Sequence, residues 1–328
     1  MSEQQHINPS MEDAYKFLNI VPNPDGSLTR STHFPTRPAS PEIDPADSEL
    51  LTLSKDLPLN PTNNTFIRLF RPRNRPPNTK LPLILFFHGG GFILLSATYS
   101  IFHDSCSRVA ADIPAVIASL EYAPEIRLRT KMRWRPSCGL KPSTRRRAVD
   151  SWMKMADFSR VFLMGSSAGG NMVYHAGLRV VDVDLRPVKI VGLIMDQPFF
   201  GGVRRTESEL KNKDPILPLH ATDLMWSLSL PEGADRGHEY CDPFAGGSLD
   251  EQIGRLPTSL VRGYAGDILI DKQKGVCEML EERGVRVVAK LIDGGHHAVE
   301  IIDPKFAREF YDDIKNFVCT VAAADQDN

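Results

Sequence analysis

The chain has 328 residues, of which 41% are hydrophobic and 24% are charged, a balance that supports a large folded core and excludes an intrinsically disordered chain. The sequence has no apolar run of about eighteen residues and no basic stretch followed by an apolar one at its N-terminus, so it predicts neither a membrane span nor a secretory signal. Five scattered cysteines without a C-x-x-C pair, together with a net charge of −2, favour a cytoplasmic protein without a disulfide framework or a zinc site.

Polar, proline-rich sequence fills most of the first sixty residues, with one short helix predicted over 11–18. Beyond it, apolar runs typical of strands alternate with stretches of helical periodicity, which indicates an α/β fold with a mostly parallel sheet covered on both faces. The polar stretch 201–247, with a helical island near 221–226, predicts an insertion over the strand ends. The predicted strands are 65–70, 81–87, 115–120, 161–164, 190–195, 259–264 and 285–291, and the predicted helices are 99–111, 171–181, 271–283 and 304–323.

The strongest chemical signal is Gly165-Ser166-Ser167-Ala168-Gly169, which lies between a predicted strand and a predicted helix. A G-x-S-x-G turn in this setting is typical of a nucleophile elbow, where small residues allow a tight turn that lifts the serine Oγ above the sheet. A plain glycine-rich turn is the alternative when the motif is considered alone. The flanking elements favour the elbow, with Ser167 as the nucleophile.

A second motif, His88-Gly89-Gly90-Gly91-Phe92, directly follows the strand at 81–87. Uncovered backbone N–H groups in such a loop stabilise the negative charge that develops on a carbonyl oxygen during acyl transfer. A flexible turn or a phosphate-binding loop is the alternative, but the G-K-[ST] and G-x-G-x-x-G patterns of phosphate loops are absent here. The two glycine motifs together are far more specific than either one.

A serine nucleophile needs a base, and the base needs a carboxylate to orient it. Asp267 ends one predicted strand, and His296 and His297 follow the next one. The order Ser, Asp, His is that of the α/β-hydrolases. Asp267 is favoured over Asp271 and His297 over His296, although spacing alone decides neither pair.

The chain resembles the plant carboxylesterases, α/β-hydrolases related to hormone-sensitive lipase, and most of all their kiwifruit member. The resemblance spans nearly the whole chain. It rests on both glycine motifs and on three further segments, which are Val21-Pro22-Asn23-Pro24-Asp25-Gly26, Gly266-Asp267-Ile268-Leu269-Ile270-Asp271 and His297-Ala298-Val299.

This resemblance implies one α/β-hydrolase domain over 1–328 with an eight-stranded sheet and a cap built from about 1–45 and 200–245. It also implies that Ser167 is the nucleophile, Asp267 the acid and His297 the base. No metal or organic cofactor is expected. The implied oxyanion donors are the N–H groups of Gly90, Gly91 and Ala168, and the accompanying motif residues are His88, Gly89, Gly165 and Gly169.

The implied reaction is hydrolysis of a small-molecule carboxylic ester through an acyl-enzyme, with organophosphates as inhibitors and neither nucleic acid nor membrane as a partner. Activity is expected to rise with pH near neutrality as His297 loses its proton. Gly90→Val is expected to cost activity more than stability. One alternative is a non-catalytic binding protein like the gibberellin receptor, in which an aliphatic residue replaces the histidine that is present here. The other is a pseudoenzyme, and the oligomeric state is not apparent from the sequence.

The segment 126–155 departs from the family pattern. Nine basic residues and no acidic one lie between 126 and 147, yet no binding motif accompanies them, which disfavours a nucleic-acid surface. Resemblance stops after Glu121-Tyr122-Ala123-Pro124-Glu125 and resumes at 156. Codons for the family's Tyr-Glu-Asp-Ala-Met-Glu-Ala, when read one base later, encode the Thr-Lys-Met-Arg-Trp-Arg-Pro found at 130–136. We therefore hypothesise that the segment is a frameshifted reading of an acidic helix, which resequencing would test.

The same segment is predicted to be the least well-packed part of the core domain and the first part to be cleaved. Pro136 and Pro142 would each cost a helix interior about 3 kcal/mol, and the run Arg145-Arg146-Arg147 repels itself. Limited trypsin digestion is therefore expected to cut first within 127–155. Resistance equal to that of the remaining domain would contradict both the packing prediction and the physical support for a frameshift.

Overall fold

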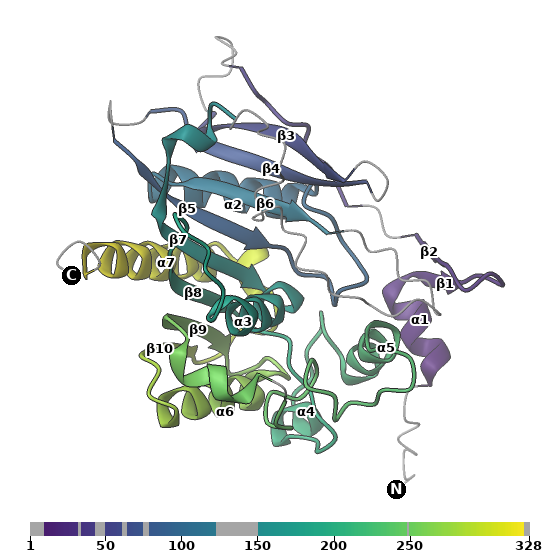
Figure 1. Cartoon of the computed structure of the whole chain (residues 1–328). Coiled ribbons are helices and arrows are strands. Elements are labelled where there is room, and N and C mark those ends of the chain that lie inside the picture. The colour runs from purple at the N-terminus through teal and green to yellow at the C-terminus, as the bar shows by residue number, and fades with distance from the viewer. Residues whose placement is uncertain are drawn as a thin grey trace, which may run out of the picture.

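The apolar runs of the sequence form the middle of one large sheet (Figure 1). The computed structural model describes residues 10–31, 34–42, 50–60, 64–74, 79–122, 150–247 and 249–324. Eight described strands pair in the order β10-β9-β8-β7-β5-β6-β4-β3. Their bounds are Thr52–Asn60 for β3, Thr65–Pro72 for β4, Leu81–Phe87 for β5, Val116–Glu121 for β6, Ala156–Ser166 for β7, Ile190–Asp196 for β8, Thr258–Tyr264 for β9 and Val287–Ile292 for β10.

Strand direction determines where the functional loops lie. β4 pairs antiparallel with both β3 and β6, whereas the pairs from β6 through β5, β7, β8 and β9 to β10 are all parallel. The carboxyl ends of six parallel strands therefore meet at one edge of the sheet, where α/β proteins place their sites. The predicted mostly parallel, eight-stranded α/β fold is confirmed.

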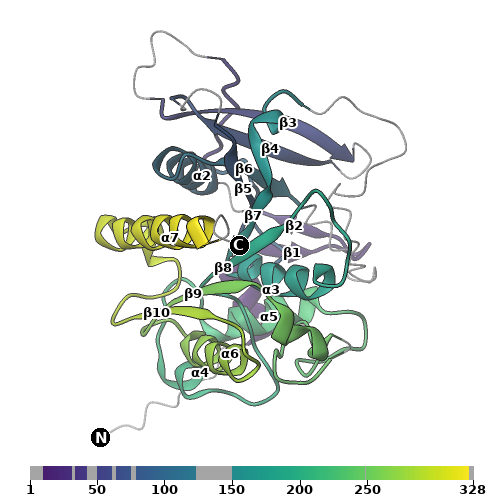
Figure 2. The same cartoon turned by 60° about the vertical axis from the view of Figure 1, so that its left-hand side comes forward.

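Helices cover both faces of this sheet (Figure 2). α2, Ser100–Asp112, and α7, Pro304–Ala324, pack on one face, and α3, Ala168–Val180, and α6, Ile270–Glu282, pack on the other. Successive side chains of a strand point to opposite faces. The buried side chains of β5 accordingly divide between two cores, with Leu83 and Leu85 on the α3 side and Ile84 and Phe86 on the α2 and α7 side.

Shorter elements lie beyond the arrowheads of the central strands (Figure 1). α1 packs against α5, and the rings of Phe17 and His220 meet with centroids 5.6 Å apart. The elements are α1, Met11–Leu18, the hairpin of β1, Ile20–Pro22, and β2, Leu28–Arg30, and in the insertion α4, Glu207–Lys211, and α5, Leu219–Ser229. The described residues also form the 3-10 turns η2, Met153–Met155, η3, Asp250–Arg255, and η4, Val299–Ile301.

The described structure holds elements that the pattern of the sequence does not predict, namely β3, the β1–β2 hairpin and α4. β3 is an edge strand, and from Lys55 onward its residues alternate between half-buried and exposed, so it carries no continuous apolar run. The helix predicted to begin at Asn171 begins at Ala168, directly after the serine. No helix of the described residues combines the length and the apolar character that crossing a bilayer requires.

The basic segment is only partly described, and 123–149 lie outside the described residues. The expectation of loose packing therefore stays a prediction, although the last six residues of the segment, 150–155, include a buried side chain. Asp150 forms an ion pair with Lys55 at 2.7 Å, and the buried Trp152 ring lies 4.4 Å from Lys55 Nζ and 4.9 Å from the Arg71 guanidinium. The charged groups of two side chains lie over an aromatic ring here, a cation–π arrangement that holds this part of the chain against β3 and β4.

Candidate active site

Ser167 occupies the turn between β7 and α3 with φ 55° and ψ −119°, which is an unusual backbone conformation for a residue with a side chain. Its N–H donates to Asp196 O at 2.8 Å, and its carbonyl accepts from Phe199 N at 2.9 Å. A Cβ on Gly169 would overlap the carbonyl of Phe87, so only glycine allows α3 to start this close to β5. The elbow therefore has the geometry predicted from the sequence, and the Ser167 side chain remains partly exposed.

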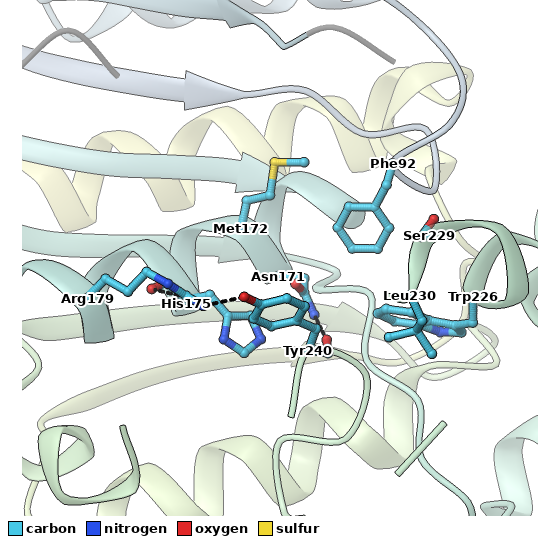
Figure 3. Close-up of a pocket in the computed structure, with 9 residues that line it drawn as sticks. All are labelled: Phe92, Asn171, Met172, His175, Arg179, Trp226, Ser229, Leu230 and Tyr240. Atoms are coloured by element: carbon cyan, nitrogen blue, oxygen red, sulfur yellow. Dashed lines mark hydrogen bonds between the residues drawn. The ribbon is translucent and has the colours of Figure 1, made fainter. Parts of the chain in front are cut away.

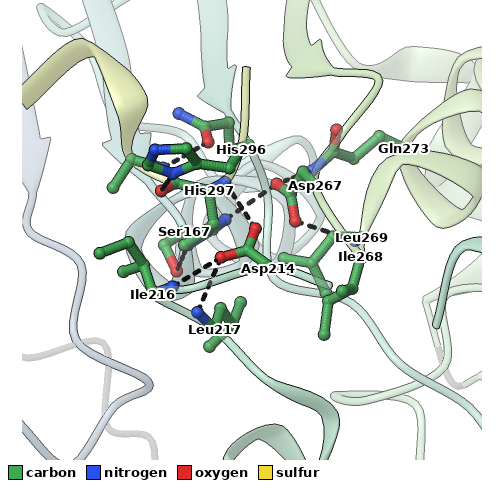
Figure 4. A network of polar contacts seen from close by, with 12 residues as sticks. Ser167, Asp214, Ile216, Leu217, Asp267, Ile268, Leu269, Gln273, His296 and His297 are labelled. Carbon is green, nitrogen blue, oxygen red and sulfur yellow. Dashed lines mark hydrogen bonds and ion pairs between the residues drawn. The ribbon is translucent and has the colours of Figure 1, made fainter. Parts of the chain in front are cut away.

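Three side chains that are far apart in the sequence meet at this elbow (Figure 4). Ser167 Oγ lies 2.9 Å from His297 Nε2, and His297 Nδ1 lies 2.8 Å from Asp267 Oδ2. Asp267 is fully buried, and its other carboxylate oxygen accepts from Leu269 N at 2.9 Å. The structure thus joins a hydroxyl, an imidazole and a carboxylate in one chain of hydrogen bonds, which is the geometry that activates a serine.

The same contacts separate the alternatives that spacing left open. Asp271 Oδ2 accepts from the backbone N–H of Ser208 instead of facing an imidazole. His296 Nδ1 lies 2.9 Å from the carbonyl of His297 and has no contact with Ser167 among the described residues. Asp267 and His297 are therefore the pair that the structure brings to the serine.

Acidic groups determine the charge state of His297. Burial alone would lower the pKa of this imidazole, but the carboxylates of Asp267, Asp214 and Glu300 together raise it to about 9. Glu300 is itself affected, because burial and the neighbouring Asp196 raise its pKa to about 8. The imidazole consequently holds a proton more strongly than an ordinary histidine.

The loop after β5 carries the second glycine motif beside the elbow. Gly90 O accepts from Ile93 N and Leu94 N, Arg30 Nε donates to Ile93 O at 2.6 Å, and Ser229 Oγ lies 3.3 Å from Gly91 O. Carbonyl groups of this loop are thus bound from the hairpin and from α5. Within the described part of the chain, the N–H groups of Gly90, Gly91 and Ala168 donate to no protein acceptor, which leaves three donors for a ligand.

His88 stabilises the conformation of this loop. Its ring is fully buried and stacks on Tyr122 at 4.0 Å between centroids, and its Nδ1 lies 2.7 Å from Gly89 O. Tyr122 donates its hydroxyl to His88 O at 2.6 Å. Burial lowers the pKa of His88 to about 4, so the ring is neutral and packs as an aromatic residue.

A cavity runs along α3 beside the site (Figure 3). It encloses about 30 Å³, which is room for one or two water molecules. Neither Ser167 nor Asp267 nor His297 lines it. The residues around it are Phe92, Asn171, Met172, His175, Arg179, Trp226, Ser229, Leu230 and Tyr240.

Two residues that sequence reasoning missed hold the loop that carries the histidine. Asp214 Oδ2 accepts from His297 N at 2.7 Å, and Gln197 Oε1 accepts from Ala298 N at 2.8 Å. Both side chains bind backbone N–H groups, so neither belongs to a motif that the sequence displays. For Asp214 the only signal was the predicted position of the insertion over the strand ends, and Gln197 lies outside that insertion.

Comparison with known proteins shows the family to which the chain belongs. Residues 84–301 match a family model described as the alpha/beta hydrolase fold. Probable carboxylesterase 8 of Arabidopsis thaliana is 47% identical to the chain, with 94% of each protein covered. The 3-O-acetylpapaveroxine carboxylesterase CXE1 of Papaver somniferum is 40% identical, with 94% of this chain and 98% of the poppy protein covered.

More distant proteins share the architecture. An esterase of Pyrobaculum calidifontis has a TM-score of 0.65 at 23% identity, with 83% of this chain and 85% of the esterase covered, a likeness of fold alone. Gibberellin receptor GID1C of Arabidopsis thaliana is 30% identical, with 82% of this chain and 80% of the receptor covered. The likeness to a kiwifruit member in particular stays a prediction. The chain belongs to the α/β-hydrolase family and, within it, to the plant carboxylesterases.

Proposed function

We propose that this protein is a serine carboxylesterase that hydrolyses small-molecule esters through an acyl-enzyme. The observation that carries the proposal is the continuous chain of contacts from Ser167 through His297 to Asp267, with 2.9 Å and 2.8 Å between the paired atoms. Hydroxyl, imidazole and carboxylate at these distances form the constellation of acyl-transfer enzymes. The family relationship supports the same reaction class.

In the first half-reaction, Ser167 Oγ attacks the ester carbonyl while His297 Nε2 takes the hydroxyl proton. Asp267 holds the imidazole so that Nε2 faces the serine, and its charge stabilises the imidazolium that forms. The N–H groups of Gly90, Gly91 and Ala168 stabilise the oxyanion of the tetrahedral intermediate. The carbon–oxygen bond to the alcohol then breaks, and His297 returns the proton to the departing alcohol.

In the second half-reaction, His297 takes a proton from water as the water oxygen attacks the acyl-enzyme carbonyl. The same three N–H donors stabilise the second oxyanion. The bond to Ser167 Oγ breaks, the proton returns to that oxygen, and the carboxylic acid leaves. No metal or organic cofactor takes part in the proposed cycle, and a cytoplasmic location stays a prediction.

The proposed cap consists of the N-terminal segment and the insertion, within one hydrolase domain. Packing of α1 on α5 supports it, as do the bonds from Arg30 and Ser229 to carbonyl groups of the glycine loop. A cap that touches the oxyanion loop would shape the space for the acyl and alcohol groups. The binding-protein alternative is disfavoured because His297 is present and in contact with Ser167.

Ser167→Ala is expected to lower ester hydrolysis on the order of 10⁴-fold, because only binding and oxyanion stabilisation remain without the nucleophile. Turnover of p-nitrophenyl esters over a series of acyl lengths provides the measurement. An organophosphate is expected to label Ser167 in the wild-type protein, as mass spectrometry of the labelled peptide would report. Labelling of Ser166 would mean that the elbow is wrongly assigned.

The pH dependence of kcat/KM is expected to follow His297, which must be neutral to accept the serine proton. Because neighbouring carboxylates raise the pKa of His297, the rise in kcat/KM is expected at a higher pH than for an ordinary histidine. His297→Gln is expected to abolish turnover. His296→Gln, the matched control, is expected to retain most of the activity, and the opposite result would exchange the two roles.

Gly90→Val is expected to lower both the melting temperature and kcat. A Cβ at Gly90 would overlap the carbonyl of Leu94, and the glycine has φ +115°, so a loss of stability is expected in addition to the loss of activity. Loss of one oxyanion donor typically costs about 10²–10³-fold in kcat. Gly284→Val is the control, because Gly284 also has positive φ but open space around it and no contact with the site. Equal kcat in the two variants would mean that the glycine loop does not contact the reaction intermediate.

A further inference from the structure

A segment of the insertion crosses the loops that carry the acid and the base (Figure 4). We define the insertion segment as residues 206–217, which contain α4 and the loop after it. We propose that this segment clamps the acid–base pair in position and that Asp214 is the residue that positions His297. The inference deepens the proposed esterase function and rests on it.

Asp214 is the central contact of the clamp. Its side chain is 5% exposed, and its Oδ2 accepts from His297 N at 2.7 Å. Its Oδ1 accepts from Ile216 N at 2.8 Å and from Leu217 N at 2.9 Å. One buried carboxylate therefore binds the insertion and the base at the same time. Hydrogen bonds from N–H groups to a carboxylate are short and strong, so the backbone of His297 cannot shift without breaking one.

Two further side chains of the segment bind the loop that carries the acid. Asn212 Nδ2 donates to Ala265 O and to Asp267 O, each at 3.0 Å. Ser208 Oγ donates to Ile268 O at 2.7 Å, and Ser208 N donates to Asp271 Oδ2 at 2.8 Å. The insertion segment thus forms hydrogen bonds with the backbone at Asp267 itself and on both sides of it.

The segment is in turn fixed to the rest of the insertion. Thr206 and Glu209 form a capping box at the start of α4. The buried Glu209 carboxylate accepts from Arg236 Nη2 at 2.8 Å and from Arg205 Nη1 at 3.3 Å, and Arg205 also pairs with Asp223 of α5. A displacement of α5 would therefore pass through α4 to the acid and base loops.

Asp214 positions the base and does not itself take part in proton transfer. The imidazole nitrogens of His297 are already in contact with Asp267 and Ser167, and Asp214 reaches only the backbone N–H. Its charge still acts on the ring. The acidic groups that face His297 are Asp267 from the loop after β9, Asp214 from the insertion and Glu300 from η4, and each favours the imidazolium when it is ionised.

The experiment compares Asp214→Asn, Asp214→Ala and Asn212→Ala with wild type. Asp235→Asn is the matched control, since Asp235 is an exposed aspartate of the same insertion whose carboxylate accepts from the nearby Gly237 N. The measurements are kcat and KM for p-nitrophenyl acetate over a range of pH, and the melting temperature. An NMR titration of His297, assigned with the aid of His297→Gln, reports the pKa of the imidazole without turnover.

Asp214→Ala is expected to lower kcat on the order of 10²-fold with little change in KM, because the base is misplaced while the binding surface remains. Asp214→Asn keeps an acceptor oxygen and removes the charge, so a smaller loss is expected. In this variant the pKa of His297 falls, and the rise in kcat/KM moves to lower pH. Asn212→Ala is also expected to lower kcat, and Asp235→Asn is expected to behave as wild type.

The outcomes separate the clamp from the esterase proposal. A folded Asp214→Asn variant with the wild-type kcat and the wild-type pKa of His297 would overturn the clamp. If at the same time wild type hydrolyses the ester and Ser167→Ala does not, the esterase proposal stands without the clamp. A lowered pKa of His297 in Asp214→Asn, in a protein that hydrolyses no ester, would support the contact and contradict the esterase. If Asp214→Ala fails to fold, Asp214→Asn and Asn212→Ala decide.

Discussion

The close approach of α3 to β5 is the constraint on which the rest of the site depends. A side chain at Gly169 would overlap the carbonyl of Phe87, so the turn at Ser167 is as tight as the backbone allows. The strained dihedral angles of Ser167 persist because its N–H and carbonyl are both bound, by Asp196 O and Phe199 N. Backbone strain, a glycine contact and two hydrogen bonds thus fix one hydroxyl beside the glycine loop.

The acid and the base are held in a different way. β10 forms an edge of the sheet of described strands, and its residues are half-buried or exposed. The loop after it therefore has a neighbouring strand on one side only. Gln197 and Asp214 supply the missing contacts to the N–H groups of Ala298 and His297. The nucleophile depends on the central sheet, whereas the base depends on side chains from outside it.

Sequence patterns predicted the parts of the structure that bury apolar surface or carry recognisable chemistry. The run at 81–87 became β5, and Ser167, Asp267 and His297 came together as the order of motifs indicated. The edge strand β3 was missed because its exposed residues, Asp56, Pro58 and Asn60, interrupt any apolar run. Asp214 was missed because its partners are backbone N–H groups. Nearly every residue has such a group, so the sequence does not reveal which ones an aspartate will bind. Spacing could not separate Asp267 from Asp271, since the direction of each side chain depends on the turn at the start of α6.

The insertion is attached to the acid and base loops. Its sequence therefore cannot change to suit another ester without also affecting the residues that transfer protons. An exchange of this insertion for one of another length, made to admit a bulkier ester, would replace Asn212 and Asp214 along with the walls of the pocket. The recipient would keep its elbow and its glycine loop, which belong to the sheet, but would inherit a base with an altered proton affinity. Grafts that retain 206–217 together with Asp223 and Arg236, which fix that segment, would leave the proton-transfer geometry with its original supports.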